Sequence, residues 1–343
     1  MKPNLVFVHA TIFLLTVAIA CKKSEQSAGT TAEKSSDKVS PLVPAQKTEE
    51  TILLKAQWPV GNKYTYRMDL AQASTMQFPG MAKPMQQEIT MAQTYSLSVP
   101  KERATGGREL EIQFIAMELD FKMGDMTMSF DSKSDTSSDK DAFLAPYRKM
   151  IGSKLHFLLD AENHLESVEN LEEWQNTVLA DSPPPAQMMI RGTYSPEFFK
   201  QLVENTRGMP SHPVKIGESW PYKTEVPTGQ MGKILLDTQV KLKGFESHEG
   251  RRCAVLESNG TIKGGATAAP GPMGGKVNLQ QGKVSGTSWF DPELGALIEA
   301  KSDQKMQFKI EPPQGAPGGG NPMTSDVSQK VTIKLVELGK INQ

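Results

Sequence analysis

Hydrophobic and polar residues alternate along most of the chain after Thr51. In 63–70 and again in 109–114 every second residue is apolar, a pattern that predicts half-buried β-strands. After Ala116 the apolar positions shift by one residue, which predicts a β-bulge or a bend at that point. Further strands are predicted over 86–99, 125–131, 153–159, 231–245, 252–263, 276–290, 296–310 and 326–338. Long strands with short connections indicate antiparallel meanders.

The central segment, residues 168–213, follows helical spacing instead. In a first predicted helix, 169–179, the apolar residues are Leu171, Trp174, Val178 and Leu179. After a break at three consecutive prolines, Ser195 and Pro196 suit the N-cap and the first residue of a second helix that ends before Gly208. Its apolar stripe consists of Phe198, Phe199, Leu202 and Val203. The predicted order is therefore strands, two helices, strands.

Two landmarks occur twice, in the same order, on either side of this helical segment. The first is a glycine turn followed by aromatic residues three and five positions later, in 61–66 and 217–222. The second is a strand, an aspartate-led turn and a second strand, in 154–165 and 286–297. Internal duplication explains both, and the alternative is that any two β-hairpins look alike.

We therefore expect a mainly β protein with minor α content. A β-rich first half, 51–167, and a β-rich second half, 214–343, flank the helices. The two halves form either one large curved antiparallel sheet or two tandem half-barrels.

The first twenty residues have the features of a secretory signal peptide. Lys2 precedes an apolar run that is short for a bilayer span and ends in small residues. The end of this run, Val17-Ala18-Ile19-Ala20-Cys21, resembles the lipobox of bacterial lipoproteins, although Ala18 stands where leucine is usual. The resemblance implies cleavage after residue 20 and acylation of Cys21. An ordinary signal peptide that leaves Cys21 as a free thiol is the alternative.

Residues 22–50 hold almost no large apolar side chain, so the segment is predicted to be a flexible tether with a mean reach of roughly 30 Å. Each buried acyl CH₂ contributes about 0.8 kcal/mol, so two or three acyl chains on Cys21 would hold the protein firmly on a membrane. The expected location is the bacterial cell envelope, facing the periplasm or the cell surface. Lys22 resembles the outer-membrane sorting signal of enteric-type lipoproteins, but the choice of membrane stays open.

Composition excludes several other classes of protein. The chain has 38 Lys and Arg against 39 Asp and Glu, and this near-neutral balance argues against a nucleic-acid partner. Two cysteines cannot build the disulfide framework of a small secreted scaffold. A hydrophobic fraction of 38% is enough for a substantial core.

The strand pattern also carries a family resemblance. The opening glycine-x-x-aromatic-x-Tyr strand and the Trp-Phe-Asp turn at 289–295 are similar to features of the lipoprotein-carrier type of bacterial envelope lipoproteins (LolA and LolB). The resemblance covers roughly 51–340 in style, and the chain is much longer than a single carrier domain. It implies a half-open β-cup covered by helices, and it assigns no functional residue and no cargo.

Three predicted loops, 76–85, 264–275 and 312–323, are rich in proline and glycine, nearly uncharged, and contain methionine. Proline and glycine end strand pairing, so these are loop tips. One hypothesis is that the tips gather at one end of the sheet as an adaptable apolar rim, with Met81, Met85, Met273 and Met323 as candidate contact residues. The alternative is three low-complexity loops without a binding role.

No cofactor and no metal are expected. Methionines at 76, 81, 85, 123, 126 and 128 have thioether spacing that can hold Cu(I), but the alternation around Met126 and Met128 favours core packing. Asp131, Asp135, Asp139 and Asp141 lack the glycine and the closing glutamate of a calcium loop. A solvated acidic loop is the better interpretation.

Catalytic motifs are not found in the sequence. Cys253 lies in an apolar run and is predicted to be a buried core residue, since no histidine motif accompanies it. The function expected from the sequence is therefore non-enzymatic: a lipid-anchored envelope protein that binds a hydrophobic ligand or a protein partner in the groove of the β-cup. The alternative is a structural or interaction protein with a filled core that acts through its loops. The aromatic residues expected near the groove, each with core packing as its alternative role, are Trp58, Tyr64, Tyr66, Trp174, Phe198, Phe199, Trp220 and Trp289.

Overall fold

The computed structural model describes residues 51–77, 81, 83–134, 144–203, 208–227, 233–264, 276–311 and 321–341. Within these ranges the main element is a twelve-stranded antiparallel sheet. Its strands are β2 (Asn62–Gln77), β3 (Met85–Glu102), β4 (Arg108–Met123), β5 (Met126–Asp131), β6 (Lys154–Leu159), β7 (Leu165–Glu169), β9 (Ser219–Pro227), β10 (Lys233–His248), β11 (Arg251–Gly264), β12 (Lys276–Asp291), β13 (Ala296–Glu311) and β14 (Met323–Lys340). A separate two-stranded sheet pairs β1 (Thr51–Ile52) with β8 (Val214–Lys215).

The strand order shows that the two halves share one sheet. Along the sheet the order is β7-β6-β4-β3-β2-β14-β13-β12-β11-β10-β9, and β5 pairs with β4 beside this path. The meander β2 to β7 and the meander β9 to β13 run in the same direction along the sheet, and β14 lies between them. Among the described strands β7 and β9 form its two ends, so the sheet is open. The prediction of a mainly β protein is confirmed, and of the two arrangements left open by the sequence the structure has the one large antiparallel sheet.

The bulge predicted after Ala116 is present in β4. Thr94 on β3 pairs with Ala116, but the next residue, Tyr95, pairs with Phe114, so Ile115 is the extra residue of a β-bulge. The side chain of Ile115 is 40% exposed, while Phe114 is buried. The extra residue is what moves the apolar positions of β4 from even to odd numbers.

Four helices are found in the described chain, where the sequence predicted two. They are α1 (Ala145–Met150), α2 (Leu171–Val178), α3 (Pro184–Thr193) and α4 (Pro196–Val203). The prolines expected to form a break in fact begin α3, because proline suits the first turn of a helix, where its missing N–H leaves no bond unmade. At α4 the hydroxyl of Ser195 accepts a hydrogen bond from the N–H of Phe198 at 3.3 Å, as predicted for an N-cap. No helix of the described residues is both long and apolar enough to cross a membrane.

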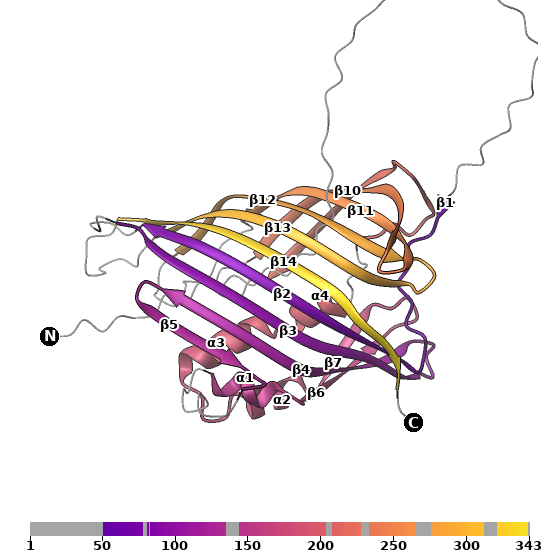
Figure 1. Ribbon diagram of the computed structural model, residues 1–343, viewed down its shortest axis with the longest axis horizontal. Coiled ribbons are helices and arrows are strands. Elements are labelled where there is room, and N and C mark those ends of the chain that lie inside the picture. The colour runs from indigo at the N-terminus through magenta and orange to yellow at the C-terminus, as the bar shows by residue number, and fades with distance from the viewer. Residues whose placement is uncertain are drawn as a thin grey trace, which may run out of the picture.

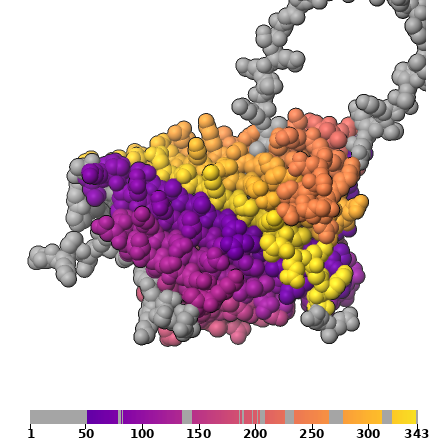
Figure 2. Space-filling model, in the orientation of Figure 1, coloured from indigo at the N-terminus to yellow at the C-terminus, as the bar shows by residue number. Residues whose placement is uncertain are grey.

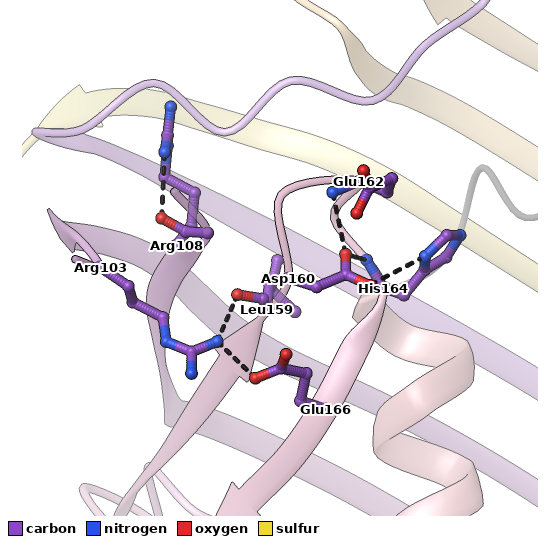
Figure 3. Close-up of polar contacts among 8 residues, drawn as sticks. Arg103, Arg108, Leu159, Asp160, Glu162, His164 and Glu166 are labelled. Atoms are coloured by element: carbon purple, nitrogen blue, oxygen red, sulfur yellow. Dashed lines mark hydrogen bonds and ion pairs between the residues drawn. The ribbon is translucent and has the colours of Figure 1, made fainter. Parts of the chain in front are cut away.

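Both repeated aspartate-led turns are held by backbone N–H groups that donate to the aspartate side chain. Asp160 Oδ1 accepts hydrogen bonds from the N–H groups of Glu162 (2.9 Å) and His164 (2.7 Å) between β6 and β7 (Figure 3). Asp291 Oδ1 accepts two bonds of the same kind, at 2.9 and 3.0 Å, from the second and third residues after it. A residue with positive φ follows in each turn: Asn163, three residues after Asp160, with φ 68°, and Gly295, four residues after Asp291, with φ 65°. The two turns therefore use the same kind of aspartate bond, but the spacing of the bonded residues differs by one.

The helices lie on one side of the sheet, which curls around them. Figure 1 shows α1 to α4 behind the half of the sheet that contains β2 to β6, on its concave side. Figure 2 shows the opposite, convex face, where strands make up nearly all of the visible surface. The concave face of the other half, β10 to β14, forms its own apolar cluster and is described next.

Candidate functional site

The space between the helices and the first half of the sheet is filled by aromatic side chains. Trp174 on α2 stacks on Phe114 of β4 with ring centroids 5.6 Å apart, and Tyr194 meets both rings edge-on. Phe199 on α4 contacts Phe157 of β6 at 5.5 Å. Such centroid distances are those of packed aromatic cores. Trp174, Phe198 and Phe199 are therefore brought together, but in a closed core and not around an open groove.

Tyr64 and Tyr66 belong to the same core, further along β2. Tyr64 meets Trp58 edge-on at 5.4 Å, and Tyr66 stacks on Tyr95 at 5.9 Å. The hydroxyl of Tyr66 donates a hydrogen bond to the backbone carbonyl of Leu297 at 3.1 Å, which links the first half of the sheet to the second. Complete burial raises the pKa of Tyr66 well above its usual value, so it stays neutral. Tyr66 therefore connects β2 in the first half of the sheet to β13 in the second half.

Trp220 and Trp289 lie elsewhere. Trp220 packs in a separate cluster on β9 and donates its indole N–H to the carbonyl of Gly208 at 2.6 Å. Trp289 alternates with the buried Ser288 and Phe290 and so faces the convex side of the sheet. There it stacks on the imidazole of His248 with centroids 4.4 Å apart. Trp289 and Phe290 are adjacent aromatic residues on one strand, so only one of them can face the core. The sequence alone did not show that this residue is Phe290 and not Trp289.

The concave face of the second half carries an apolar cluster made of sheet residues alone. Its members are Ile234, Leu236, Ile262, Val284, Met306, Phe308 and Val327, each at most 5% exposed. No residue of the described helices belongs to this cluster, whereas helix residues make up a large part of the cluster under the first half. We call these seven residues the apolar wall.

Next to the apolar wall the concave face becomes polar without becoming charged. Gln329 on β14 lies directly between Gln304 on β13 and Gln72 on β2, and all three side chains are at most 5% exposed. Three buried serines belong to the same patch: Ser258, Ser288 and Ser302. We call these six residues the polar floor. Sequence reasoning missed them, although glutamine and serine at the apolar phase of the alternation in 64–76 and 323–333 were a usable signal.

Two glycines without side chains lie in the cross-strand rows of the polar floor. Gly286 lies between Ser258 and Ser302 in the cross-strand row, and Gly260 lies between Thr238 and Val284 in the next row. A methyl group on Gly260 would lie 2.4 Å from the carbonyl oxygen of Asp237, closer than any real contact. Glycine inside a strand marks a tight bend or the close approach of another group. Here it permits the close approach of β10 to β11 at Asp237 and Thr238.

The methionine-bearing connections leave the sheet at one end. Met76 pairs with Met85 at the end of the β2–β3 hairpin, and Ile310 pairs with Met323 at the end of the β13–β14 hairpin. Ile262 and Gly282 place the β11–β12 connection at the same end. The strand ends that carry the three connections therefore lie at one end of the sheet, whereas most of the tips themselves lie outside the described residues, and the rim stays a hypothesis. Met81 is 52% exposed, Met85 is half-buried against the core, Met323 is buried, and Met273 lies outside the described residues.

The cysteine, methionine and aspartate candidates from the sequence remain to be located in the structure. Cys253 is fully buried, and desolvation raises the pKa of its thiol to about 11, which fits the predicted core role. Met126 and Met128 pack against the main core, as expected. No group of three or more His, Cys, Asp or Glu residues in the described ranges could hold a metal ion. Cys21, the tether, Asp135, Asp139 and Asp141 lie outside those ranges.

The fold and its concave face define a class: an open, curled antiparallel sheet with a helical layer over one half and an apolar, uncharged surface on the other. Residues 106–297, more than half of the chain, match the model of a family of unknown function (DUF6263), and the chain belongs to that family. A comparison with curated proteins finds no match.

Solved structures show only distant likenesses. Lipovitellin is 10% identical with a TM-score of 0.46, and the match covers 84% of this chain and 26% of lipovitellin. The outer membrane protein OprG from Pseudomonas aeruginosa is 9% identical (TM-score 0.19; 82% and 95% covered). A DUF1329 family protein from Desulfovibrio piger is 10% identical (TM-score 0.13; 80% and 86% covered). Such values support no inference about what this chain binds.

Proposed function

We propose that this protein is a lipid-anchored, non-enzymatic bacterial envelope protein that binds a hydrophobic ligand on the concave face of β10 to β14. The observation that carries the proposal is the apolar wall. Its seven large side chains face the inside of the curled sheet, and no described helix contributes to it. A ligand site needs a concave, mainly apolar surface with a few polar groups, and this half of the sheet offers both.

The different packing of the two halves of the sheet supports the proposal. The aromatic residues Phe114, Trp174 and Tyr194 fill the space between the helices and the first half of the sheet with packed rings. The second half curls in the same way but carries the apolar wall where the first half carries helices. The resemblance of the sequence to envelope lipoprotein carriers is consistent with a site of this kind.

Membrane anchoring rests on the sequence of the first fifty residues. Acylation of Cys21 would fix the protein to a membrane, and the tether would hold the sheet clear of the surface. In this proposal the protein faces the periplasm or the cell surface. The test is Cys21→Ser, which should move the protein from the membrane fraction to the soluble fraction after cell lysis. Retention of the variant on the membrane would contradict the anchor.

The ligand is tested by extraction. Full-length protein purified from its membrane, washed and then extracted with organic solvent should release a stoichiometric amphiphile that mass spectrometry detects. A double substitution in the apolar wall, Met306→Asp with Val327→Asp, should abolish recovery of that molecule, because it places charges on the binding surface. The matched control, Lys305→Asp with Ser328→Asp, changes the neighbouring residues on the convex side and should leave recovery unchanged. Equal recovery from both double variants would refute the site.

A second function is favoured by the strand ends that carry the three methionine-bearing connections, which lie at one end of the sheet. The exposed Met81 gives this end a soft apolar contact point for a partner protein. Met81→Asp should then reduce co-purification of an envelope protein after crosslinking while leaving ligand recovery intact. An unchanged set of crosslinked partners would count against this second function.

A further inference from the structure

The polar floor contains hydrogen-bonding groups that the protein itself does not satisfy. Neither the Nε2 nor the Oε1 of Gln329 has a hydrogen-bond partner among the described residues, although the side chain is only 1% exposed. The hydroxyls of Ser258, Ser288 and Ser302 are also buried without a partner among the described residues. Nearly all buried polar groups in native proteins are hydrogen-bonded, and each exception destabilises the fold. Four such residues in one patch indicate that a bound molecule supplies the missing hydrogen bonds.

We infer that the ligand is a long-chain lipid whose buried polar group is an uncharged ester, amide or hydroxyl, held by Gln329 and Ser302. This inference rests on the proposed function, since it names the chemistry of the molecule that lies on the apolar wall. The following observations carry it: the contiguity of the polar groups, the lack of charge in the described rows around them, and the position of the apolar wall.

The polar groups are contiguous across the sheet. Gln304, directly opposite Gln329, is two residues from Ser302 on the same face of β13. From Ser302 the cross-strand row passes through Gly286, which has no side chain, to Ser258. Ser288 is the next residue on the same face of β12. One ligand group seated over Gly286 would therefore have donors and acceptors on several sides.

Charge is absent from the described rows of this part of the concave face. The rows through Gln329 and Ser302 contain only uncharged residues from β10 to β2: Thr238, Gly260, Val284, Gln304, Gln329 and Gln72 in one, and Val240, Ser258, Gly286, Ser302, Val331 and Leu70 in the other. A carboxylate, phosphate or ammonium group buried here would have no counter-charge in these rows, and burial of an unpaired charge is strongly unfavourable. A neutral amide side chain instead both donates to and accepts from a neutral ester, amide or hydroxyl.

The apolar wall gives the direction of the ligand's chain. Met306 and Val327 lie two residues from Gln304 and Gln329 on the same face, and Phe308 lies further along β13. An acyl or alkyl chain that starts at the polar floor can therefore continue over the apolar wall toward the end of the sheet where Met76 and Met323 lie. The site fits an amphiphile better than a plain hydrocarbon.

The test compares matched ligands and matched variants of the full-length chain, delipidated before use. The neutral fluorophore N-phenyl-1-naphthylamine reports occupancy of the apolar surface, and 1-dodecanol and dodecanoate compete with it. For the wild-type protein, dodecanol should compete at least about tenfold more strongly than dodecanoate in mildly alkaline buffer. Competition by dodecanoate as strong as that by dodecanol would overturn the inference.

The variants separate the inference from the proposed function. Gln329→Leu should weaken dodecanol about tenfold and leave the affinity for the fluorophore within about twofold, because it removes hydrogen bonds and keeps the volume. Ser302→Ala, a smaller change, should weaken dodecanol by about threefold or more. Gln307→Leu, the same substitution as the first on the convex face of β13, should change neither value. Fluorophore binding with no selective loss of dodecanol overturns the inference alone, whereas no fluorophore binding by the wild-type protein overturns the proposed function and the inference together.

Discussion

Gln329 on β14 and Gln72 on β2 lie directly opposite each other where the last strand of the sheet joins the first meander. Because the amide of Gln329 is buried without a partner in the described part of the chain, its replacement by leucine should stabilise the ligand-free protein. We expect Gln329→Leu to raise the free energy of unfolding by about 1–2 kcal/mol in denaturant titrations. Gln307→Leu on the convex face serves as the control and should change it by less than about 0.5 kcal/mol. Destabilisation by Gln329→Leu would mean that the amide is satisfied.

Two adjacent phenylalanines of α4 offer a matched test of the aromatic core. Phe199 is fully buried against Phe157 and Trp174, whereas Phe198 is only half-buried and meets Tyr194 and Phe199 edge-on. Phe199→Ala should cost about 3–5 kcal/mol of unfolding free energy, and Phe198→Ala about 1–2 kcal/mol. Equal losses, measured by denaturation of both variants, would show that α4 does not pack as described.

The backbone around Gly260 leaves no space for a side chain at this position. A Cβ at this position would lie 2.4 Å from the backbone oxygen of Asp237, and backbone atoms cannot easily move away. Gly260→Ala should therefore lower the free energy of unfolding by about 1–3 kcal/mol. A methyl group on Gly192 in α3 would meet nothing within 4 Å, so Gly192→Ala should stabilise the protein by about 0.5–1 kcal/mol. Thermal denaturation of the two variants should shift in opposite directions.

The two aspartates should differ in how much their replacement destabilises the protein, although each accepts two backbone hydrogen bonds. Asp291 is buried and also pairs with Arg251 at 2.9 Å, whereas Asp160 is more exposed. We expect Asp291→Ala to cost about 2–3 kcal/mol and Asp160→Ala about 1 kcal/mol in denaturant titrations. Equal costs would show that the pairing with Arg251 adds nothing to the turn.

Acid should reveal the contribution of Asp160. Partial burial opposes the charged form, but the N–H groups of His164 and Glu162 and the side chain of His164 outweigh it and lower the pKa of Asp160. The stabilisation by Asp160 is therefore complete above the pKa of the unfolded chain and is lost as pH falls through the lowered pKa of the folded protein. The stability difference between wild type and Asp160→Ala should shrink in that acidic range. A constant difference would contradict the assignment.

Cys253 should be inert in the folded protein. Desolvation raises the pKa of its thiol to about 11, and the side chain is fully buried, so the reactive thiolate is scarce and shielded. In the Cys21→Ser protein, iodoacetamide in mildly alkaline buffer should modify Cys253 only after denaturation, as measured by intact mass. Modification of the native protein at the denatured rate would show that this part of β11 opens readily.

The strands were largely predictable because their chemistry is local. Alternation around Tyr64 and Tyr66 gives the phase of β2, and the phase shift after Ala116 gives the bulge at Ile115. The N-cap at Ser195 was equally readable. The choice between one sheet and two half-barrels was not, because it depends on the pairing of β14 with β2, more than 200 residues apart in sequence. No local pattern encodes such a long-range register.

The candidate site was predictable only in part. Large aromatic residues such as Trp174 and Phe199 suit a groove and a core equally well, and the structure places them in a core because four short helices cover that half of the sheet. The polar floor was overlooked because Gln329 and Ser302, taken singly, resemble surface residues. Their meaning comes from burial and from cross-strand neighbours that only the folded sheet supplies.

The position of β14 has a consequence for biosynthesis. Both its neighbours, β13 and β2, are made earlier, and each keeps an unpaired edge until Met323–Lys340 has been synthesised. Unpaired strand edges promote association between chains, and pairings distant in sequence form slowly. The nascent chain therefore exposes two unpaired edges until the last strand is inserted, and a truncation before Met323 should leave a chain that aggregates more readily.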